Sequence, residues 1–354
     1  MIYFCAMLNK IFSNTFDCSI IASYIDFLFG VRYNKYILKR DVLFHILIYN
    51  QNRLYKEGIL MRVGTMTSLF RGRRESPDYI GYIESIRRCH QAGFRVLDMN
   101  MCALSRRQTT LHQDDWKQQV DEIANEAAKL GMEFVQSHPP YRGRLDLELM
   151  STPEGAEFFE EMMLRAIEIT KMLGGKWCVM HPACDRSVET GDIEKQIAYN
   201  KKLFARELEL SAKIGVGLAF ENMCDAGNRR NFCVTADELI ALMDACNSEY
   251  VGVCWDVGHA NRMMDNQVPS ILKLGDRIKA LHIDDNRGKD DLHVLPFTGF
   301  IPWEDVMHAL YQGGCKAGLI FEIGTCGDKM PECLKDEAAK LCYKVGEHLV
   351  SLYK

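Results

Sequence analysis

Acidic residues and histidines stand at the ends of several short apolar runs in this sequence. Five of the 10 histidines belong to this set, together with several carboxylates. The members are Ser137-His138, His181, Glu221-Asn222, Asp256, His259, His282, Asp284, Asp291, His293 and Glu322. One buried histidine is usually a hydrogen-bonded structural residue. Five histidines that meet several carboxylates instead predict a metal or catalytic site.

Carboxylates packed together in an apolar site repel one another and resist ionisation unless a positive charge lies among them. A divalent cation provides this charge, and we predict that it is bound by Glu221, Asp256, His282 and Glu322. Three carboxylates and one imidazole form an oxygen-rich ligand set, which favours Mn²⁺ and also suits Mg²⁺, Co²⁺ or Zn²⁺. Four protein ligands leave coordination positions open for substrate oxygens, as in catalytic sites.

Short apolar runs, each followed by a longer amphipathic stretch, can position these residues. Runs of about five or six residues fit strands that are buried on both faces. The runs are Val63–Ser68, Phe94–Met99, Glu133–Ser137, Trp177–Met180, Gly215–Phe220, Val251–Trp255, Ile278–His282 and Gly318–Ile323. Strand–helix alternation indicates parallel pairing, and eight repeats predict a (β/α)8 TIM barrel rather than an open sheet with extra strands. The active site of such a barrel lies at the carboxyl ends of its strands.

Helix start and stop signals separate the apolar runs. Thr152-Pro153 predicts a helix start with threonine as the N-cap, and Gly174-Gly175 predicts its end. Thr235 and Glu238 have the spacing of a capping box. No glycine-rich dinucleotide fingerprint follows the first run, which removes the main reason to prefer an open sheet.

Composition excludes several classes of protein. The net charge is −5 without a dense basic run, so we expect no nucleic-acid partner. The 14 cysteines include no Cys-x-x-Cys pair, which argues against a zinc ribbon and suits a reducing, cytoplasmic location. The apolar stretch at residues 19–31 is too short to span a membrane and contains Asp26, so we expect no membrane insertion.

The first sixty residues differ from the rest of the chain. Residues 1–60 are rich in Ile, Tyr, Phe, Asn and Lys and lack a sustained period or caps, which predicts a poorly ordered extension before a catalytic domain at residues 61–354. A second hypothesis is that they are not translated. Lys56-Glu57-Gly58 can be encoded as a ribosome-binding sequence just upstream of Met61, a suitable start. The intact mass of the native protein distinguishes the two.

Four segments resemble the xylose-isomerase-like barrel superfamily, especially its sugar-phosphate isomerase/epimerase branch. They are Phe220-Glu221-Asn222, Trp255–Ala260, Leu281–Asn286 and Phe321-Glu322-Ile323. Ser137-His138 and Met180-His181-Pro182 match the ends of the family's third and fourth strands, and Asp291, His293, Pro296, Gly299 and Trp303 match the loop after the seventh. The resemblance runs from about Arg62 to the C-terminus, and the order and spacing of the motifs carry it.

This resemblance implies roles for individual residues. The family's metal ligands fall on Glu221, Asp256, His282 and Glu322, and the two glutamates also act as its acid/base pair. The implied reaction is isomerisation or epimerisation of a sugar or sugar phosphate through a metal-stabilised enediolate, with one carboxylate on each face of the reacting carbon. Candidate substrate contacts or further metal ligands are His138, His181, His259, Asp291 and His293, with Arg287 as a weaker candidate for substrate contact.

Other functions share this scaffold. A sugar or cyclitol dehydratase would use the same metal and enolate and then expel a hydroxyl. A DNA-repair endonuclease of the endonuclease IV type would hold three zinc ions, and its ligand types fit His138, His181, Glu221, Asp256, His259, His282, Asp291, His293 and Glu322. The acidic net charge argues against that activity. The intact ligand set argues against a barrel that only binds, and the lysine typical of true xylose isomerases is not found.

The loop after the seventh strand departs from the family pattern. Family members often have Pro-Gly-x-Gly there, whereas this chain has Pro296-Phe297-Thr298-Gly299. We therefore expect the loop to cover the substrate differently, which leaves the identity of the sugar and its phosphorylation open. Barrels of this family often pair, so a homo-oligomer is a further expectation, while the sequence does not define the oligomeric state.

Overall fold

The computed structural model describes residues 61–70, 80–189, 191–225, 227, 229–324 and 330–354. Its strands form one parallel 8-stranded sheet in the order β7-β6-β5-β4-β3-β2-β1-β8. Their bounds are β1 Val63–Met66, β2 Val96–Asn100, β3 Glu133–His138, β4 Trp177–Met180, β5 Gly217–Glu221, β6 Val251–Asp256, β7 Ile278–His282 and β8 Leu319–Phe321. Each strand overlaps one of the eight predicted apolar runs, which confirms the (β/α)8 TIM barrel.

Strand β8 pairs with β1 on one side and is bonded to the end of β7 on the other, which closes the sheet into a barrel. β1 pairs with β8 in parallel, with Gly64 opposite Ile320. One residue beyond β7, Ile283 donates its N–H to the carbonyl of Ile320 at 2.8 Å and accepts from the N–H of Glu322 at 3.1 Å. These two bonds bring His282 and Glu322 to the same end of adjacent strands.

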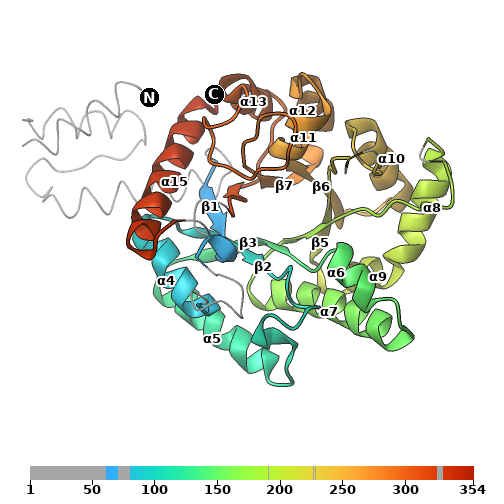
Figure 1. The fold of residues 1–354 in the computed structure, drawn as a ribbon, viewed down its shortest axis with the longest axis horizontal. Helices are drawn as coiled ribbons and strands as arrows, with labels where there is room; N and C mark the ends of the chain where they lie inside the picture. The colour runs from blue at the N-terminus through green and yellow to red at the C-terminus, as the bar shows by residue number, and fades with distance from the viewer. Residues whose placement is uncertain (1–60, 71–79, 190, 226, 228, 325–329) are drawn as a thin grey trace, which may run out of the picture. The chain divides into compact units, whose positions relative to one another are not determined.

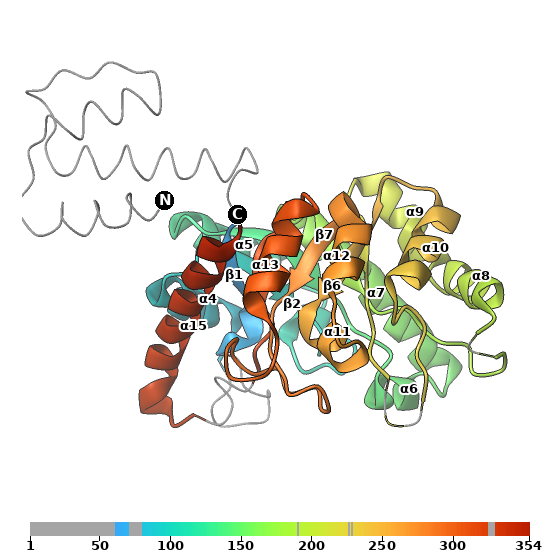
Figure 2. The same ribbon diagram turned by 90° about the horizontal axis from the view of Figure 1, so that it is seen from above.

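Helices surround the strands in a ring (Figure 1). The longer ones are α4 Tyr82–Ala92, α5 Trp116–Lys129, α7 Pro153–Met172, α8 Ile193–Leu203, α9 Ala205–Ile214, α10 Ala236–Cys246, α13 Trp303–Gln312 and α15 Glu332–Leu352. The shorter ones are α6 Arg144–Leu149, α11 Val257–Met263 and α12 Val268–Leu274. The last helix, α15, packs against both α4 and α13, so it completes the ring (Figure 2).

The predicted caps are present. Thr152 accepts a hydrogen bond from the N–H of Gly155 at the start of α7, with Pro153 as the first helical residue. Thr235 and Glu238 form a reciprocal capping box at the start of α10. Gly215 ends α9 with a φ of 72°, a left-handed conformation that glycine adopts without steric cost. Local sequence therefore defines where these helices begin and end.

The barrel interior becomes polar toward the carboxyl ends of the strands. Ala219, Cys254 and Ala280 pack together with Val179 inside β4 to β7, while Met66, Val96 and Ile320 pack together inside β1, β2 and β8. Side chains two residues apart on a strand point to the same face. The residue two positions after each interior residue on β5 to β8 is a predicted ligand, namely Glu221, Asp256, His282 and Glu322. The interior residues before Glu221, Asp256 and His282 are the small side chains Ala219, Cys254 and Ala280.

Three further observations bear on the sequence predictions. Residues 1–60, on which the predicted extension falls, lie outside the described part of the chain. The cysteines of the described part are free thiols. Among the described helices, none combines the length and apolar character needed to cross a membrane.

Candidate metal centre and active site

The four predicted ligands converge at the carboxyl ends of β5 to β8. Glu221, Asp256, His282 and Glu322 each offer a ligand atom, and these atoms all lie within 4.8 Å of one another. His282 Nδ1 is the common neighbour, at 2.7 Å from Glu221 Oε1, 2.9 Å from Glu322 Oε2 and 3.9 Å from Asp256 Oδ2. The structure thus brings together the four residues selected from the sequence, and their role as metal ligands stays a prediction.

The donor set fits a divalent cation. Three of these side chains are fully buried, and Glu322 is largely buried. Asp256 Oδ2 is buried and has no hydrogen-bond partner among the described residues, although it faces His282 Nδ1. A buried carboxylate oxygen without a partner is costly unless a cation binds it. Oxygen-rich donors with one imidazole suit Mn²⁺, Mg²⁺, Co²⁺ or Zn²⁺.

The pKa values of the three carboxylates are shifted because these groups are buried close to one another and to histidines. Burial alone would raise the pKa of Glu221, but His282 and His181 beside it lower the pKa well below its usual range. Burial also opposes ionisation of Glu322, whose pKa falls to about 2 because of His282. Burial raises the pKa of Asp256 to about 7, with His259 opposing the shift and Glu221 adding to it. Positive charge on neighbouring histidines thus favours the ionised forms of Glu221 and Glu322, and a bound cation could supply the same charge.

Asn222 and the start of α11 hold Asp256 in place. The Asn222 amide donates to the carbonyl of Asp256 at 2.8 Å and accepts from its N–H at 2.6 Å. Asp256 is also the N-cap of α11, since its Oδ1 accepts the N–H of His259 at 2.6 Å. One carboxylate oxygen is therefore used to begin the helix, and Oδ2 is left to face the cluster.

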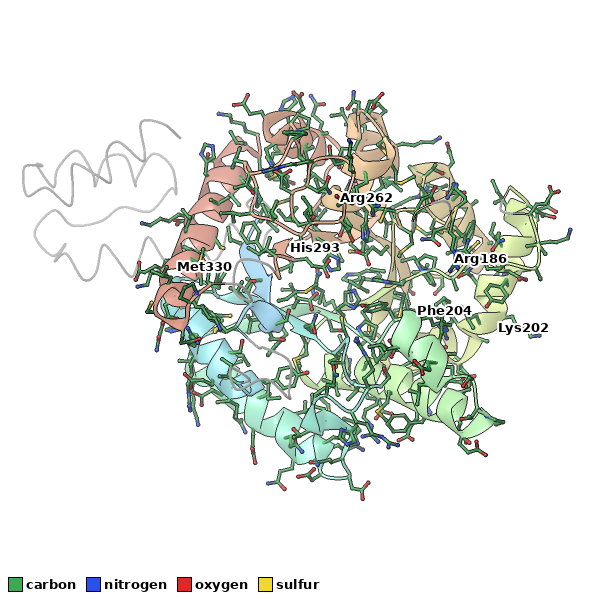
Figure 3. All side chains as sticks on the ribbon, in the orientation of Figure 1. Arg186, Lys202, Phe204, Arg262, His293 and Met330 are labelled. Atoms are coloured by element: carbon green, nitrogen blue, oxygen red, sulfur yellow. The ribbon has the colours of Figure 1, made fainter. Side chains whose placement is uncertain are left out.

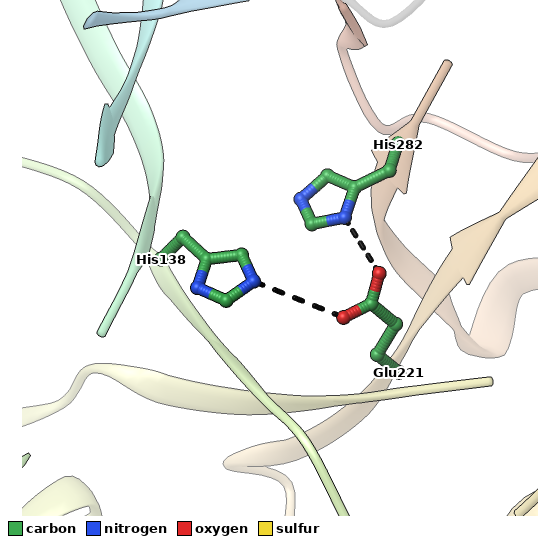
Figure 4. Close-up of side chains that lie close together, drawn as sticks. All are labelled: His138, Glu221 and His282. Carbon is green, nitrogen blue, oxygen red and sulfur yellow. Dashed lines mark hydrogen bonds and ion pairs between the residues drawn. The ribbon is translucent and has the colours of Figure 1, made fainter. Parts of the chain in front are cut away.

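Two further predicted histidines lie against Glu221. His181 Nε2 is 2.7 Å from Glu221 Oε2, and His138 Nε2 is 3.9 Å from the same oxygen. The rings of His138 and His282 both point toward the Glu221 carboxylate (Figure 4). His138, Glu221 and His282 form a second group with the composition of a metal site. Glu221 can therefore take part in either group.

A third group lies on the other side of Asp256. His259 Nε2 is 3.4 Å from Asp291 Oδ2, and His293 Nε2 is 3.2 Å from the same oxygen. Cys224, which follows β5, joins His259 and Asp291 in a group that could also hold a metal ion. His293 Nδ1 is bonded to the carbonyl of Glu322 at 2.9 Å and lies over the middle of the barrel (Figure 3).

A cavity of about 330 Å³ opens beside this cluster, between β1, β2, β8 and the loop after β7. Its walls combine the carboxylates of Glu322 and Asp291 with polar Asn100 and apolar Phe321. Arg287, the remaining predicted contact, is exposed, and the structure does not bring it into the cluster. Its role in substrate binding stays a prediction.

Asp285 fixes the loop that carries Asp291 and His293. Its buried carboxylate accepts hydrogen bonds from the N–H groups of Phe297 at 3.0 Å and Ile301 at 3.3 Å, and from Trp303 Nε1 at 3.0 Å. Phe297 has a φ of 71°, so this position has the backbone conformation that favours the glycine of the family pattern. The ring of Phe297 packs near Trp303 and His348.

We expect Asp285→Ala to destabilise the barrel by on the order of 3–5 kcal/mol, because it leaves several buried donors without an acceptor. It should also weaken cation binding, because it releases the loop that carries Asp291 and His293, the predicted substrate contacts or further ligands. Urea unfolding and metal titration measure the two effects. Asp290→Ala, in the same loop but exposed, is the control and should change neither. Equal stability of the two variants would contradict this role of Asp285.

The family is defined by comparison with known proteins. A family model described as xylose isomerase-like TIM barrel matches residues 86–344, which is most of the chain. The chain belongs to this family. This confirms the resemblance that the sequence motifs carry.

Individual relatives of this xylose isomerase-like barrel are distant. The uncharacterized protein y4fM of Sinorhizobium fredii is 29% identical over 46% of this chain and 51% of its own length. A probable endonuclease 4 of Mesomycoplasma hyopneumoniae is 23% identical over 46% of this chain and 60% of its own length. The chain thus spans about half to two thirds of these curated relatives. A D-psicose 3-epimerase of Enterocloster bolteae is 24% identical over 72% of this chain and 81% of its own length.

Solved structures share the fold. A D-tagatose 3-epimerase-like protein superposes with a TM-score of 0.63 at 18% identity, over 83% of this chain and 98% of its own. The IOLI protein, whose structure contains a zinc atom, superposes with a TM-score of 0.62 at 16% identity, over 83% of this chain and 99% of its own. At such low identities the likeness concerns the fold alone.

Cys224 and Asp98, which lie near the cluster of this xylose isomerase-like barrel, were not among the predicted site residues, and Asp284 was part of the strand-end set but was given no role. Cys224 lies three positions after Glu221, and Asp98 interrupts an otherwise apolar run, which is the signal that could have identified it. Both oxygens of Asp284 are buried without a hydrogen-bond partner among the described residues. A Cβ at Gly258 would lie 2.0 Å from Asp284 Oδ1, so only glycine leaves space for this carboxylate.

Proposed function

We propose that the barrel of residues 61–354 is a divalent-metal-dependent isomerase or epimerase of a sugar or sugar phosphate. The observation that carries the proposal is the group formed by Glu221, Asp256, His282 and Glu322, whose ligand atoms lie within 4.8 Å of one another beside a cavity of about 330 Å³. A cavity of this size suits a small carbohydrate. The likeness to a D-psicose 3-epimerase and to a D-tagatose 3-epimerase-like structure supports the same reaction class.

A bound divalent cation would act as a Lewis acid that polarises a ketose carbonyl. Glu221 from β5 and Glu322 from β8 would then exchange a proton with the carbon next to that carbonyl. Their carboxylates approach the same His282 Nδ1 atom, at 2.7 Å and 2.9 Å, from different strands. One carboxylate, in its ionised form, would accept the proton from one face of the carbon. The other, in its protonated form, would donate a proton to the opposite face, which inverts the carbon and exchanges the protonation states of the two carboxyl groups.

Asp256 and the surrounding histidines would hold the substrate and the cation. Asp256 is kept in place by Asn222 and by the start of α11, so it can act as a fixed ligand. We infer that His138, His181 and His259 contact substrate hydroxyls, since their rings surround Glu221. Mn²⁺ is our proposed metal, because the ligand set is dominated by carboxylate oxygens.

Solvent exchange tests the proposed function. With Mn²⁺ present, we expect deuterium from D₂O to enter the carbon next to the carbonyl of one or more ketoses in a panel of free and phosphorylated sugars. Removal of the metal with a chelator should abolish the exchange, and added Mn²⁺ should restore it, because the C–H bond is acidified only when the carbonyl is polarised. Exchange that is unaffected by the chelator would contradict metal dependence. Loss of a hydroxyl would indicate a dehydratase.

A second candidate function is that of an endonuclease, favoured by the overlapping metal groups and by the endonuclease 4 relative. Such an activity requires cations at the rim that can bind phosphates. Arg230 instead pairs with Glu238 at 2.7 Å, and Arg142 packs over the rings of Phe159 and Phe204. Metal content per chain separates the candidates: about three zinc ions would favour the endonuclease, and about one manganese ion the isomerase.

A further inference from the structure

Asp98 is a buried aspartate in the interior of the barrel, beside the candidate metal centre. It lies on β2 two positions after Val96, which packs inside the barrel, and it is fully buried. Its Oδ2 accepts a hydrogen bond from Gln136 Nε2 at 2.9 Å, and Gln136 is its partner in the register of β2 and β3. Its Oδ1 has no hydrogen-bond partner in the described part of the chain.

A buried aspartate and glutamine are unusual in this position. The interior of a TM barrel is normally filled by branched aliphatic side chains. A buried carboxylate with a single amide donor regains little of the hydrogen bonding that it has in water, so burying Asp98 here is costly unless another polar group compensates. A specific interaction of Asp98 with another polar group would explain why the interior contains it.

His282 is the polar group that Asp98 faces. His282 Nε2 is 3.9 Å from Asp98 Oδ2, and this nitrogen is buried without a hydrogen-bond partner among the described residues. The opposite ring nitrogen, Nδ1, faces Glu221 and Glu322 at 2.7 Å and 2.9 Å. The imidazole therefore lies between Asp98 on one side and the candidate ligands on the other.

We propose that Asp98 is a positioning residue that orients His282 for cation binding, with Gln136 fixing the carboxylate of Asp98. A histidine that binds a cation through Nδ1 must carry its proton on Nε2, and that N–H needs an acceptor. Asp98 supplies the acceptor, selects this tautomer and makes Nδ1 a stronger donor. The inference rests on the proposed metal site and adds to it a residue that does not touch the cation.

Titration with Co²⁺ alone tests this role, because its visible absorption reports both affinity and coordination geometry. We expect Asp98→Asn to weaken Co²⁺ binding about 10- to 100-fold and to alter the spectrum of the bound ion. Gln136→Met, which keeps the volume but removes the donor to Asp98, should weaken binding to a smaller extent. The double variant should bind Co²⁺ about as weakly as Asp98→Asn alone, because both substitutions act through the carboxylate of Asp98.

Ser211→Ala is the matched control. Ser211 is fully buried on α9, and its hydroxyl donates to the carbonyl of Val216 at 2.6 Å, so the control removes a buried hydrogen bond away from the metal centre. The Co²⁺ affinity of this control variant and the spectrum of its bound Co²⁺ should equal those of the unmodified protein. Wild-type affinity in Asp98→Asn would overturn the proposal while leaving the metal site intact. If Asp98→Asn does not fold, wild-type affinity in Gln136→Met overturns it. Absence of Co²⁺ binding by the unmodified protein would refute both the metal site and this role of Asp98.

Discussion

Replacing either Glu221 or Glu322 by glutamine is expected to reduce metal-dependent proton exchange into a ketose by at least about 10²- to 10⁴-fold. Glutamine has nearly the same shape as glutamate but is neither a base near neutral pH nor an anionic ligand. Each substitution therefore removes a proton-transfer group and weakens cation binding. The two losses are separated by measuring the residual exchange at Mn²⁺ concentrations that saturate the variant.

The two glutamates should differ in how the loss arises. Glu221 contacts His282 and His181, both at 2.7 Å, so its replacement should also disturb these histidines. Glu322 borders the cavity, where a substrate would lie, so its replacement should act more directly on the chemical step. Glu207→Gln is the control, because Glu207 is a fully buried glutamate on α9 outside the site. Full activity of either the Glu221 or the Glu322 variant would rule out the two-glutamate mechanism.

Cation affinity is expected to fall steeply as the pH decreases through neutrality. In the metal-free protein burial raises the pKa of Asp256 to about 7. Burial would lower the pKa of His282, but Cys254 and the carboxylates of Glu322 and Glu221 raise it well above its usual value. Both groups must lose their protons to bind a cation. Affinity should therefore change about tenfold per pH unit for each proton released.

The direction in which cation affinity changes with pH follows from which groups are protonated in the metal-free protein. Below pH 7 both His282 and Asp256 carry a proton in the metal-free protein, so the affinity should fall about 100-fold per pH unit as the pH decreases. Above pH 7 Asp256 is already ionised, and His282 alone should give a slope of about tenfold per unit. Glu322, with a pKa of about 2, contributes nothing in this range.

Mn²⁺ titrations from about pH 6 to pH 8 would measure this dependence. Asp256→Asn is the informative variant, because it should bind more weakly overall and lose the change of slope near pH 7. Affinity that does not vary with pH would show that Asp256 and His282 are not ligands of the cation.

The sequence alone determined the order of the elements and the residues at their ends. Apolar runs of strand length, the capping box at Thr235 and Glu238, and the helix-ending Gly215 are local signals, and the structure has a strand or helix boundary at each. The rule that barrel sites lie at strand carboxyl ends then selected Glu221, Asp256, His282 and Glu322. The predicted strands and helix ends are present in the structure because these predictions need only the chain's own periodicity and a known architecture, whereas the roles of the four residues stay predictions.

The tertiary structure decided which of these side chains face one another and which other residues join them. Asp98 is separated from His282 by about half of the chain, and only the closure of the barrel brings them to 3.9 Å. Cys224 joins His259 and Asp291 through the packing of separate loops, whereas Arg287 lies in the expected loop but is exposed. Such contacts depend on strand register and on the direction of each side chain, and neither is encoded in the residues near a single position.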